Sequence, residues 1–71
     1  MAFSYDKLWK LLIDKKMNKV ALRDAISISP NTLSKLSRDQ YVSMEVLDKI
    51  CKELNCDISD IMEYKRDLED K

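Results

Sequence analysis

The sequence contains no glycine in 71 residues. Tight β-hairpin turns favour glycine because their central residues adopt positive φ, so a hairpin-rich β fold is disfavoured. Gly-rich phosphate-binding loops are excluded as well, which removes the P-loop and dinucleotide-binding proteins. Hydrophobic residues make up 45% and charged residues 37%, a balance typical of a compact globular chain. We therefore expect residues 1–71 to form a single domain that is not built from hairpins.

Histidine is also absent, which removes the commonest general base and the commonest zinc ligand. The two cysteines, Cys51 and Cys56, are too few for a zinc site and are expected to be small buried residues in a reducing compartment. The sequence predicts no metal, no cofactor and no enzyme activity. We see neither a signal peptide nor an apolar run long enough to span a membrane, so the expected location is the cytoplasm.

Apolar residues recur at helical spacing, and a capping residue precedes each run. The expected N-caps are Ser4, Asn18, Ser29, Ser43 and Asp57, and Asn55 is expected to end the fourth helix. The predicted helices cover about 4–16, 18–25, 30–38, 43–54 and 57–64. Strand patterning is absent. These segments predict an all-α, compact five-helix bundle with a core over about 5–64 and a charged tail over 65–71.

The net charge is zero, but the charges are unevenly distributed along the chain. Residues 1–38 contain eight Lys/Arg and three Asp/Glu, giving +5, whereas residues 39–71 contain five and ten, giving −5. Such asymmetry suggests a side that faces an anion. Chance dispersion of surface charge explains it equally well, so composition leaves both interpretations open.

The most informative stretch is residues 18–38, where two short helices flank a tight turn. Pro30 disfavours helix at the residue before it and suits the first position of a new helix, so the second helix begins there. The exposed side of that helix is entirely hydrogen-bonding and contains no acid: Ser29, Asn31, Thr32, Ser34, Lys35 and Arg38. These groups can pair with base edges and phosphates in a major groove, and Lys19 can add an anion contact. An ordinary solvated helix face is the alternative.

At this point the sequence resembles a known family. MNKVAL at 17–22 and ISPNTLSKL at 28–36 are similar to the helix-turn-helix of the phage-repressor-like (Cro/repressor, Xre-type) proteins. The stretch VSMEVLDKICKELNCDISDI at 42–61 resembles the next two helices of that family. The resemblance covers about residues 5–64. It implies a five-helix, lambda-repressor-like domain that regulates transcription by binding double-stranded operator DNA, usually as a dimer on a palindrome.

The resemblance also implies residue roles, with the recognition helix over about 30–38. Asn18 and Lys19 correspond to positions from which members of the family bind DNA phosphate at the start of the second helix. The remaining DNA-binding candidates lie on or after the recognition helix: Ser29, Pro30, Asn31, Thr32, Ser34, Lys35, Arg38 and Gln40. Arg38 and Gln40 fall where contacts to the DNA backbone are common, and Pro30 can offer only an apolar contact, for instance to a thymine methyl.

Two positions depart from the family pattern. Ser27 stands where the family usually has a turn glycine, and a non-glycine residue at positive φ costs on the order of 1 kcal/mol. Arg23 stands where the family usually has a small residue, and the sequence assigns it no role. Its stem is expected to lie across the helix interface, with pairing to Asp24 or Asp39, or a contact to DNA, as the options.

The spacing of Ile61, Tyr64 and Leu68 suggests an apolar stripe on the last helix, from which we predict a homodimer through the C-terminal helix. Trp9 and Tyr5, on the first helix, are expected at the core or its edge. One alternative function stays open: the helix-turn-helix fold could serve as a protein-interaction module that regulates a partner protein instead of reading DNA.

Overall fold

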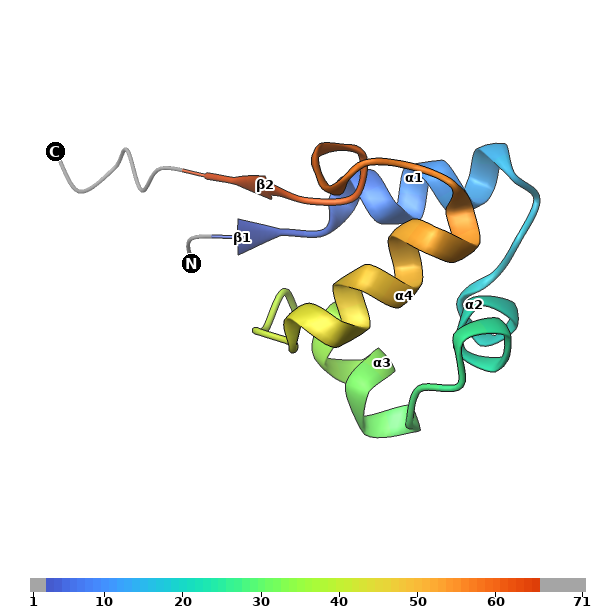
Figure 1. The fold of residues 1–71 in the computed structure, drawn as a ribbon. Coiled ribbons are helices and arrows are strands. Elements are labelled where there is room, and N and C mark those ends of the chain that lie inside the picture. The colour runs from blue at the N-terminus through green and yellow to red at the C-terminus, as the bar shows by residue number, and fades with distance from the viewer. Residues whose placement is uncertain (1–2, 66–71) are drawn as a thin grey trace, which may run out of the picture.

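The structure is a computed structural model that describes residues 3–65. Within these residues the chain forms four α-helices, one 3-10 helix and two short strands (Figure 1). In chain order they are β1 (Phe3–Ser4), α1 (Asp6–Asp14), α2 (Lys19–Ile26), α3 (Pro30–Ser37), α4 (Met44–Leu54), η1 (Ile58–Asp60) and β2 (Glu63–Tyr64). The helices pack around one core, and α3 lies at the side of the molecule opposite α1 (Figure 1).

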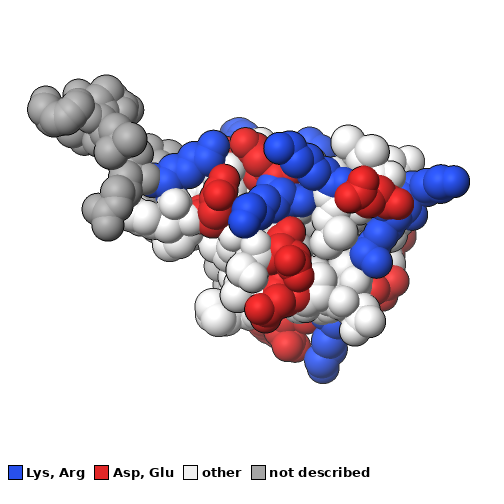
Figure 2. All heavy atoms as spheres, turned by 90° about the horizontal axis from the view of Figure 1, so that it is seen from above, with Lys and Arg blue, Asp and Glu red and all other residues white. Residues whose placement is uncertain are grey.

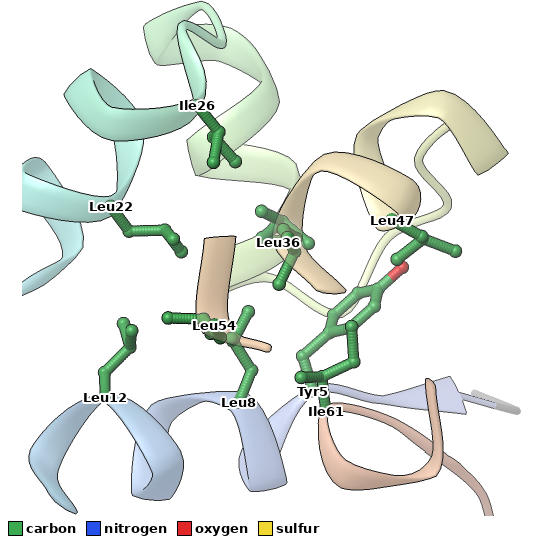
Figure 3. Packing of buried hydrophobic residues seen from close by; sticks show 10 residues of the cluster. Tyr5, Leu8, Leu12, Leu22, Ile26, Leu36, Leu47, Leu54 and Ile61 are labelled. Carbon is green, nitrogen blue, oxygen red and sulfur yellow. The ribbon is translucent and has the colours of Figure 1, made fainter. Parts of the chain in front are cut away.

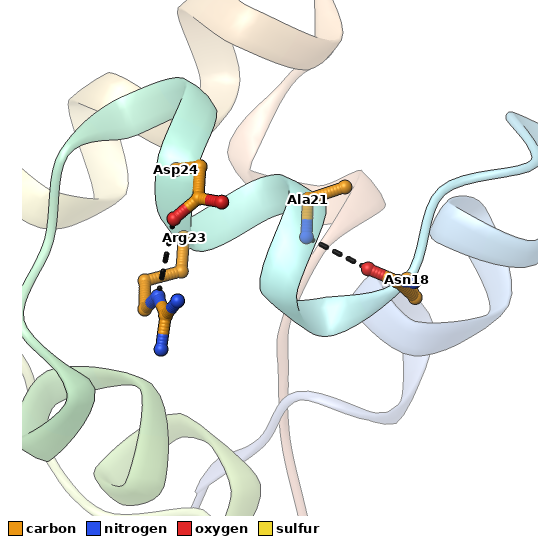
Figure 4. Close-up of polar contacts among 4 residues, drawn as sticks. All are labelled: Asn18, Ala21, Arg23 and Asp24. Atoms are coloured by element: carbon orange, nitrogen blue, oxygen red, sulfur yellow. Dashed lines mark hydrogen bonds and ion pairs between the residues drawn. The ribbon is translucent and has the colours of Figure 1, made fainter.

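Three of the predicted N-caps are confirmed at α2, α3 and α4. The Asn18 side chain accepts a hydrogen bond from the Ala21 backbone N–H at 2.7 Å, as drawn in Figure 4. Ser29 and Ser43 accept from the N–H groups three residues further on, at 3.1 and 3.2 Å. Each cap satisfies a backbone donor that the first turn of a helix cannot satisfy itself. Local side-chain chemistry therefore sets where these helices begin.

Because the chain lacks glycine, its tight turns place other residue types in the left-handed region. Among residues 3–65, positive φ occurs at Lys16, Ser27, Asp39 and Asn55, with φ between 52° and 60°. Asn55 ends α4 as predicted. Ser27 ends α2 at φ 58° and ψ 47°, so the turn keeps the left-handed geometry and the serine accepts its steric cost.

Replacing Ser27 with glycine is expected to stabilise the protein by about 0.5 kcal/mol. Glycine relieves the steric cost of the left-handed conformation, but its greater freedom in the unfolded chain offsets part of the gain. Thermal unfolding followed by circular dichroism should show a rise in Tm of ~2–4 °C. The matched control is Ser27→Ala, which keeps a Cβ and should give no rise. An equal rise in both variants would contradict the strain at this turn.

The prediction of five helices is wrong, because the C-terminal segment folds differently. The Asp57 N–H donates to the Asp60 carboxylate at 2.9 Å, and the turn that this closes is the three-residue η1 rather than a longer helix. The chain then continues as β2, which pairs antiparallel with β1 in the register Phe3↔Tyr64 and Ser4↔Glu63. Pairing with the other end of the chain therefore replaces the expected helical turns.

This difference affects the apolar stripe that was predicted on the last helix. Ile61 is fully buried in the core, and Tyr64 lies on β2 with its ring edge-on to Phe3 at 5.4 Å. The two residues therefore do not form an exposed helical stripe, and the predicted homodimer stays a prediction. Leu68 lies outside the described residues.

The start of α1 also differs from prediction. The helix begins at Asp6 and ends at Asp14, with Tyr5 at the N-cap position. Ser4 belongs to β1, although its hydroxyl still accepts a hydrogen bond from the Asp6 N–H at 3.2 Å. The buried Tyr5 ties this end of the chain to the segment after α3, because its hydroxyl donates to the Gln40 carbonyl at 2.9 Å. Burial raises the pKa of Tyr5, which keeps that donor protonated.

In the part of the chain that the structure describes, ten buried apolar residues form the core, and each of the four α-helices contributes to it (Figure 3). They are Tyr5, Leu8, Leu12, Leu22, Ile26, Leu36, Leu47, Ile50, Leu54 and Ile61. Leu36 is the only buried residue of α3, and it points into the cluster between the α2 and α4 side chains. The rest of α3 is therefore available at the surface.

Both cysteines are half-buried and carry free thiols. Burial raises the pKa of Cys51 and of Cys56, which disfavours the reactive thiolate. Among residues 3–65, no group of three or more possible metal-ligating side chains is present. The longest helix in that range, α4, has 11 residues and is too short to cross a bilayer.

Candidate nucleic-acid interface

The α2–α3 pair packs against the core on one side and is exposed to solvent on the other. Leu22 and Ile26 of α2 and Leu36 of α3 are buried in the same cluster (Figure 3). Ile28, in the turn, packs against this cluster and is half-buried. Because these contacts hold one side of α3, its other side projects from the molecule. This is the geometry that lets a second helix enter a groove of a duplex.

None of the predicted DNA-binding residues is buried. Thr32 and Ser34 are half-buried, and the others are exposed: Asn18, Lys19, Ser29, Pro30, Asn31, Lys35, Arg38 and Gln40. The set spans the N-terminus of α2, the length of α3 and the residues just after it. Its side chains are accessible to a partner, while their roles in binding stay a prediction.

Hydrogen bonds within α3 engage some of these side chains. The Ser29 and Thr32 hydroxyls lie 3.0 Å apart and share a hydrogen bond. The Arg38 guanidinium donates to the Ser34 hydroxyl at 3.0 Å. By contrast, the side chains of Asn31 and Lys35 make no hydrogen bond within residues 3–65. These two can therefore offer their full donor and acceptor capacity to an external partner.

The electrostatics of α3 favour an anionic partner. The first turn of the helix contains no acidic residue, and Lys35 lies in the last turn. The N-terminus of a helix carries a partial positive charge and free N–H groups, which attract phosphate. On the opposite side of the molecule, Lys and Arg alternate with Asp and Glu across the surface (Figure 2). That face therefore carries charges of both signs, whereas the charged side chain of α3 is positive.

Lys19 makes contacts that the sequence did not predict. Its ammonium lies 4.3 Å from the centre of the Trp9 ring on α1. The same ammonium donates to the Ser37 hydroxyl at the end of α3, at 3.2 Å. Trp9 and Ser37 lie 10 and 18 positions from Lys19 in sequence, too far to be paired by helical spacing, so no local signal could have predicted these contacts.

Arg23 pairs with Asp24, one of the two carboxylates that the sequence offered as partners. Its Nε lies 3.3 Å from the Asp24 carboxylate, as Figure 4 shows. The Arg23 side chain is 31% exposed, so its stem is partly covered while the charge reaches the surface. Asp39, the other option, instead accepts a hydrogen bond from the Tyr5 N–H at 3.0 Å.

A capped helix, a left-handed turn and a projecting second helix together define a helix-turn-helix protein. Residues 7–67 match the family of the Cro/C1-type HTH DNA-binding domain, and the chain belongs to this family. The family that the sequence resembled is thereby confirmed, as is the DNA-binding class of protein.

Among solved structures, a transcriptional regulator is similar to this chain over nearly its whole length. The match is described as the crystal structure of the transcriptional regulator VanUg, form II. The two sequences are 48% identical, the TM-score is 0.90, and the match covers 93% of this chain and 88% of that chain. A comparison with curated proteins found no match.

Proposed function

We propose that this protein is a sequence-specific regulator of transcription that inserts α3 into the major groove of double-stranded DNA. The observation that carries the proposal is the surface of α3, which is hydrogen-bonding, free of acidic residues and accessible along its length. The major groove presents distinct donors and acceptors for each base pair, so such a surface can read sequence there. The similarity to a protein named as a transcriptional regulator supports the same conclusion.

Asn31 and Lys35 are the proposed base-reading residues. Both are exposed, and they lie four positions apart, which puts them on one side of α3. Asn can pair bidentately with adenine, and Lys can donate to guanine. Short side chains at the same surface would supply further contacts. The hydroxyls of Ser29, Thr32 and Ser34 would bind bases or phosphate, and Pro30 would contact a thymine methyl.

The proposed phosphate contacts surround α3. Asn18 and Lys19 lie at the start of α2, and Arg38 and Gln40 follow the end of α3. Phosphate contacts fix the register of a protein on the duplex but carry no base information themselves. Removing them should weaken binding to all sequences alike.

We further propose that two copies bind a palindromic operator. One recognition helix covers few base pairs, and helix-turn-helix proteins gain specificity from two half-sites about 34 Å apart. Such a homodimer would not use a helical stripe at Ile61 and Tyr64, because Ile61 is buried and Tyr64 lies on β2. Under this proposal the protein acts in the cytoplasm and represses by occupying its operator.

Selection of bound sequences from a random duplex pool tests the proposal. We expect enrichment of a motif with two-fold symmetry, and a steep loss of affinity with increasing salt, because phosphate contacts release counterions. If no motif is enriched and wild-type binding is insensitive to salt, the DNA-reading function is wrong. The protein-interaction alternative would then account for the exposed face of α3.

A further inference from the structure

The Lys19 ammonium is held where three helices meet. Lys19 begins α2, Trp9 belongs to α1 and Ser37 is the last residue of α3. The ammonium lies over the Trp9 ring at 4.3 Å and donates to the Ser37 hydroxyl at 3.2 Å. Attraction between a cation and an indole ring is the strongest of its kind among the aromatic side chains. The Lys19 charge is thus held in place by side chains of two other helices.

The apolar surroundings support the same placement. Trp9 is half-buried and packs against the core. It lines a depression of about 300 Å³ together with Met17 and Lys19. A lysine stem on apolar surface with its charge at the rim is a stable arrangement. Lys19 nevertheless remains exposed, so a phosphate can reach it.

An ammonium has three N–H donors. One is directed to Ser37, and the Trp9 ring covers another side of the group. A further donor is available to an external acceptor. A free lysine side chain loses rotamer entropy when it binds, whereas a lysine already held in place loses less. The two contacts therefore prepare Lys19 to bind an anion beside the end of α3.

We propose that Trp9 and Ser37 are positioning residues, which hold the Lys19 ammonium for a DNA phosphate flanking the groove that α3 enters. This inference rests on the function proposed above and extends it to α1. Neither residue needs to touch DNA for this role. The Trp9 ring would contribute to affinity through Lys19 alone, so its effect must depend on the lysine being present.

A double-mutant cycle tests this dependence. Binding of a mixed-sequence 30-bp duplex at low salt is measured for wild type, Trp9→Leu, Lys19→Met and the double variant. We expect Trp9→Leu to raise Kd about two- to fivefold in the wild-type background and to have no effect when Lys19 is already Met. Trp9→Phe, which keeps a ring, should give a smaller loss, and Ser37→Ala a loss of up to about threefold.

The free protein supplies a readout that needs no DNA. Trp9 is the sole tryptophan, so Lys19→Met is expected to shift its fluorescence emission by removing the charge above the ring. Circular dichroism identifies a variant that fails to fold, in which case Trp9→Phe takes its place in the cycle.

Each outcome decides the question. An equal loss for Trp9→Leu in both backgrounds would show a structural role only and would overturn the inference. So would unchanged affinity in Trp9→Leu, or unchanged emission in Lys19→Met. Failure of the wild type to bind any duplex would overturn the proposed function together with this inference. The outcomes above overturn the inference alone, because in them the wild type still binds DNA.

Discussion

Asn31→Ala and Lys35→Ala are each expected to weaken binding to a selected operator by about 1–3 kcal/mol, or roughly 5- to 150-fold. Both side chains are exposed on α3 and make no hydrogen bond within residues 3–65, so each can direct all its polar groups at a base. Fluorescence anisotropy with the operator and with a mixed-sequence duplex, at one fixed salt concentration, measures the loss. The loss should be much larger on the operator.

Two matched lysines serve as controls for that experiment. Lys19→Ala should weaken binding to both duplexes alike and reduce the slope of log affinity against log salt by about 1, because it removes a phosphate contact. Lys7 donates to the Ser59 carbonyl, between α1 and η1, away from α3. Lys7→Ala should leave both affinities unchanged. An equal loss on both duplexes for Asn31→Ala and Lys35→Ala would contradict their role in reading bases.

Leu36→Ala is expected to lower the free energy of unfolding by about 2–5 kcal/mol. Leu36 is fully buried and is the only core residue of α3, so truncation leaves a cavity where α3 meets α2 and α4. A domain of this size has a total stability of roughly 4–10 kcal/mol, so the variant should lose a large share of it and unfold at a clearly lower urea concentration. Urea unfolding monitored by circular dichroism measures the change.

Leu33, on the same helix but only half-buried, provides the comparison. Leu33→Ala removes the same atoms from a less covered site and should cost clearly less. If both substitutions cost the same amount, Leu36 is not the residue that anchors α3. Leu36→Met keeps the volume and should cost less than about 1.5 kcal/mol.

The middle of the fold could be predicted from sequence because local chemistry sets it. Asn18, Ser29 and Ser43 cap helices through bonds to residues three positions away, and a cap needs no information from the rest of the chain. Pro30 fixes the start of α3 in the same local way. The exposed face of α3 followed from these boundaries and from the position of Leu36.

The C-terminal segment could not be predicted because its partner is distant. Ile58, Ile61 and Tyr64 recur at helical spacing, yet Tyr64 pairs with Phe3 at the far end of the sequence. Two-residue strands are too short to show the alternation that marks a strand in sequence. The Lys19 contacts with Trp9 and Ser37 escaped prediction for the same reason, since three helices must first pack before the groups meet.

An NMR titration of the isotopically labelled protein with a duplex carrying the selected operator tests the central claim most directly. The backbone amide signals of Asn18, Lys19, Ser29 and residues 31–38, and the side-chain amide signals of Asn18 and Asn31, are expected to shift on binding. Those of η1, on the opposite side, should stay in place. Shifts centred on η1 and α1, with α3 unperturbed, would contradict the account.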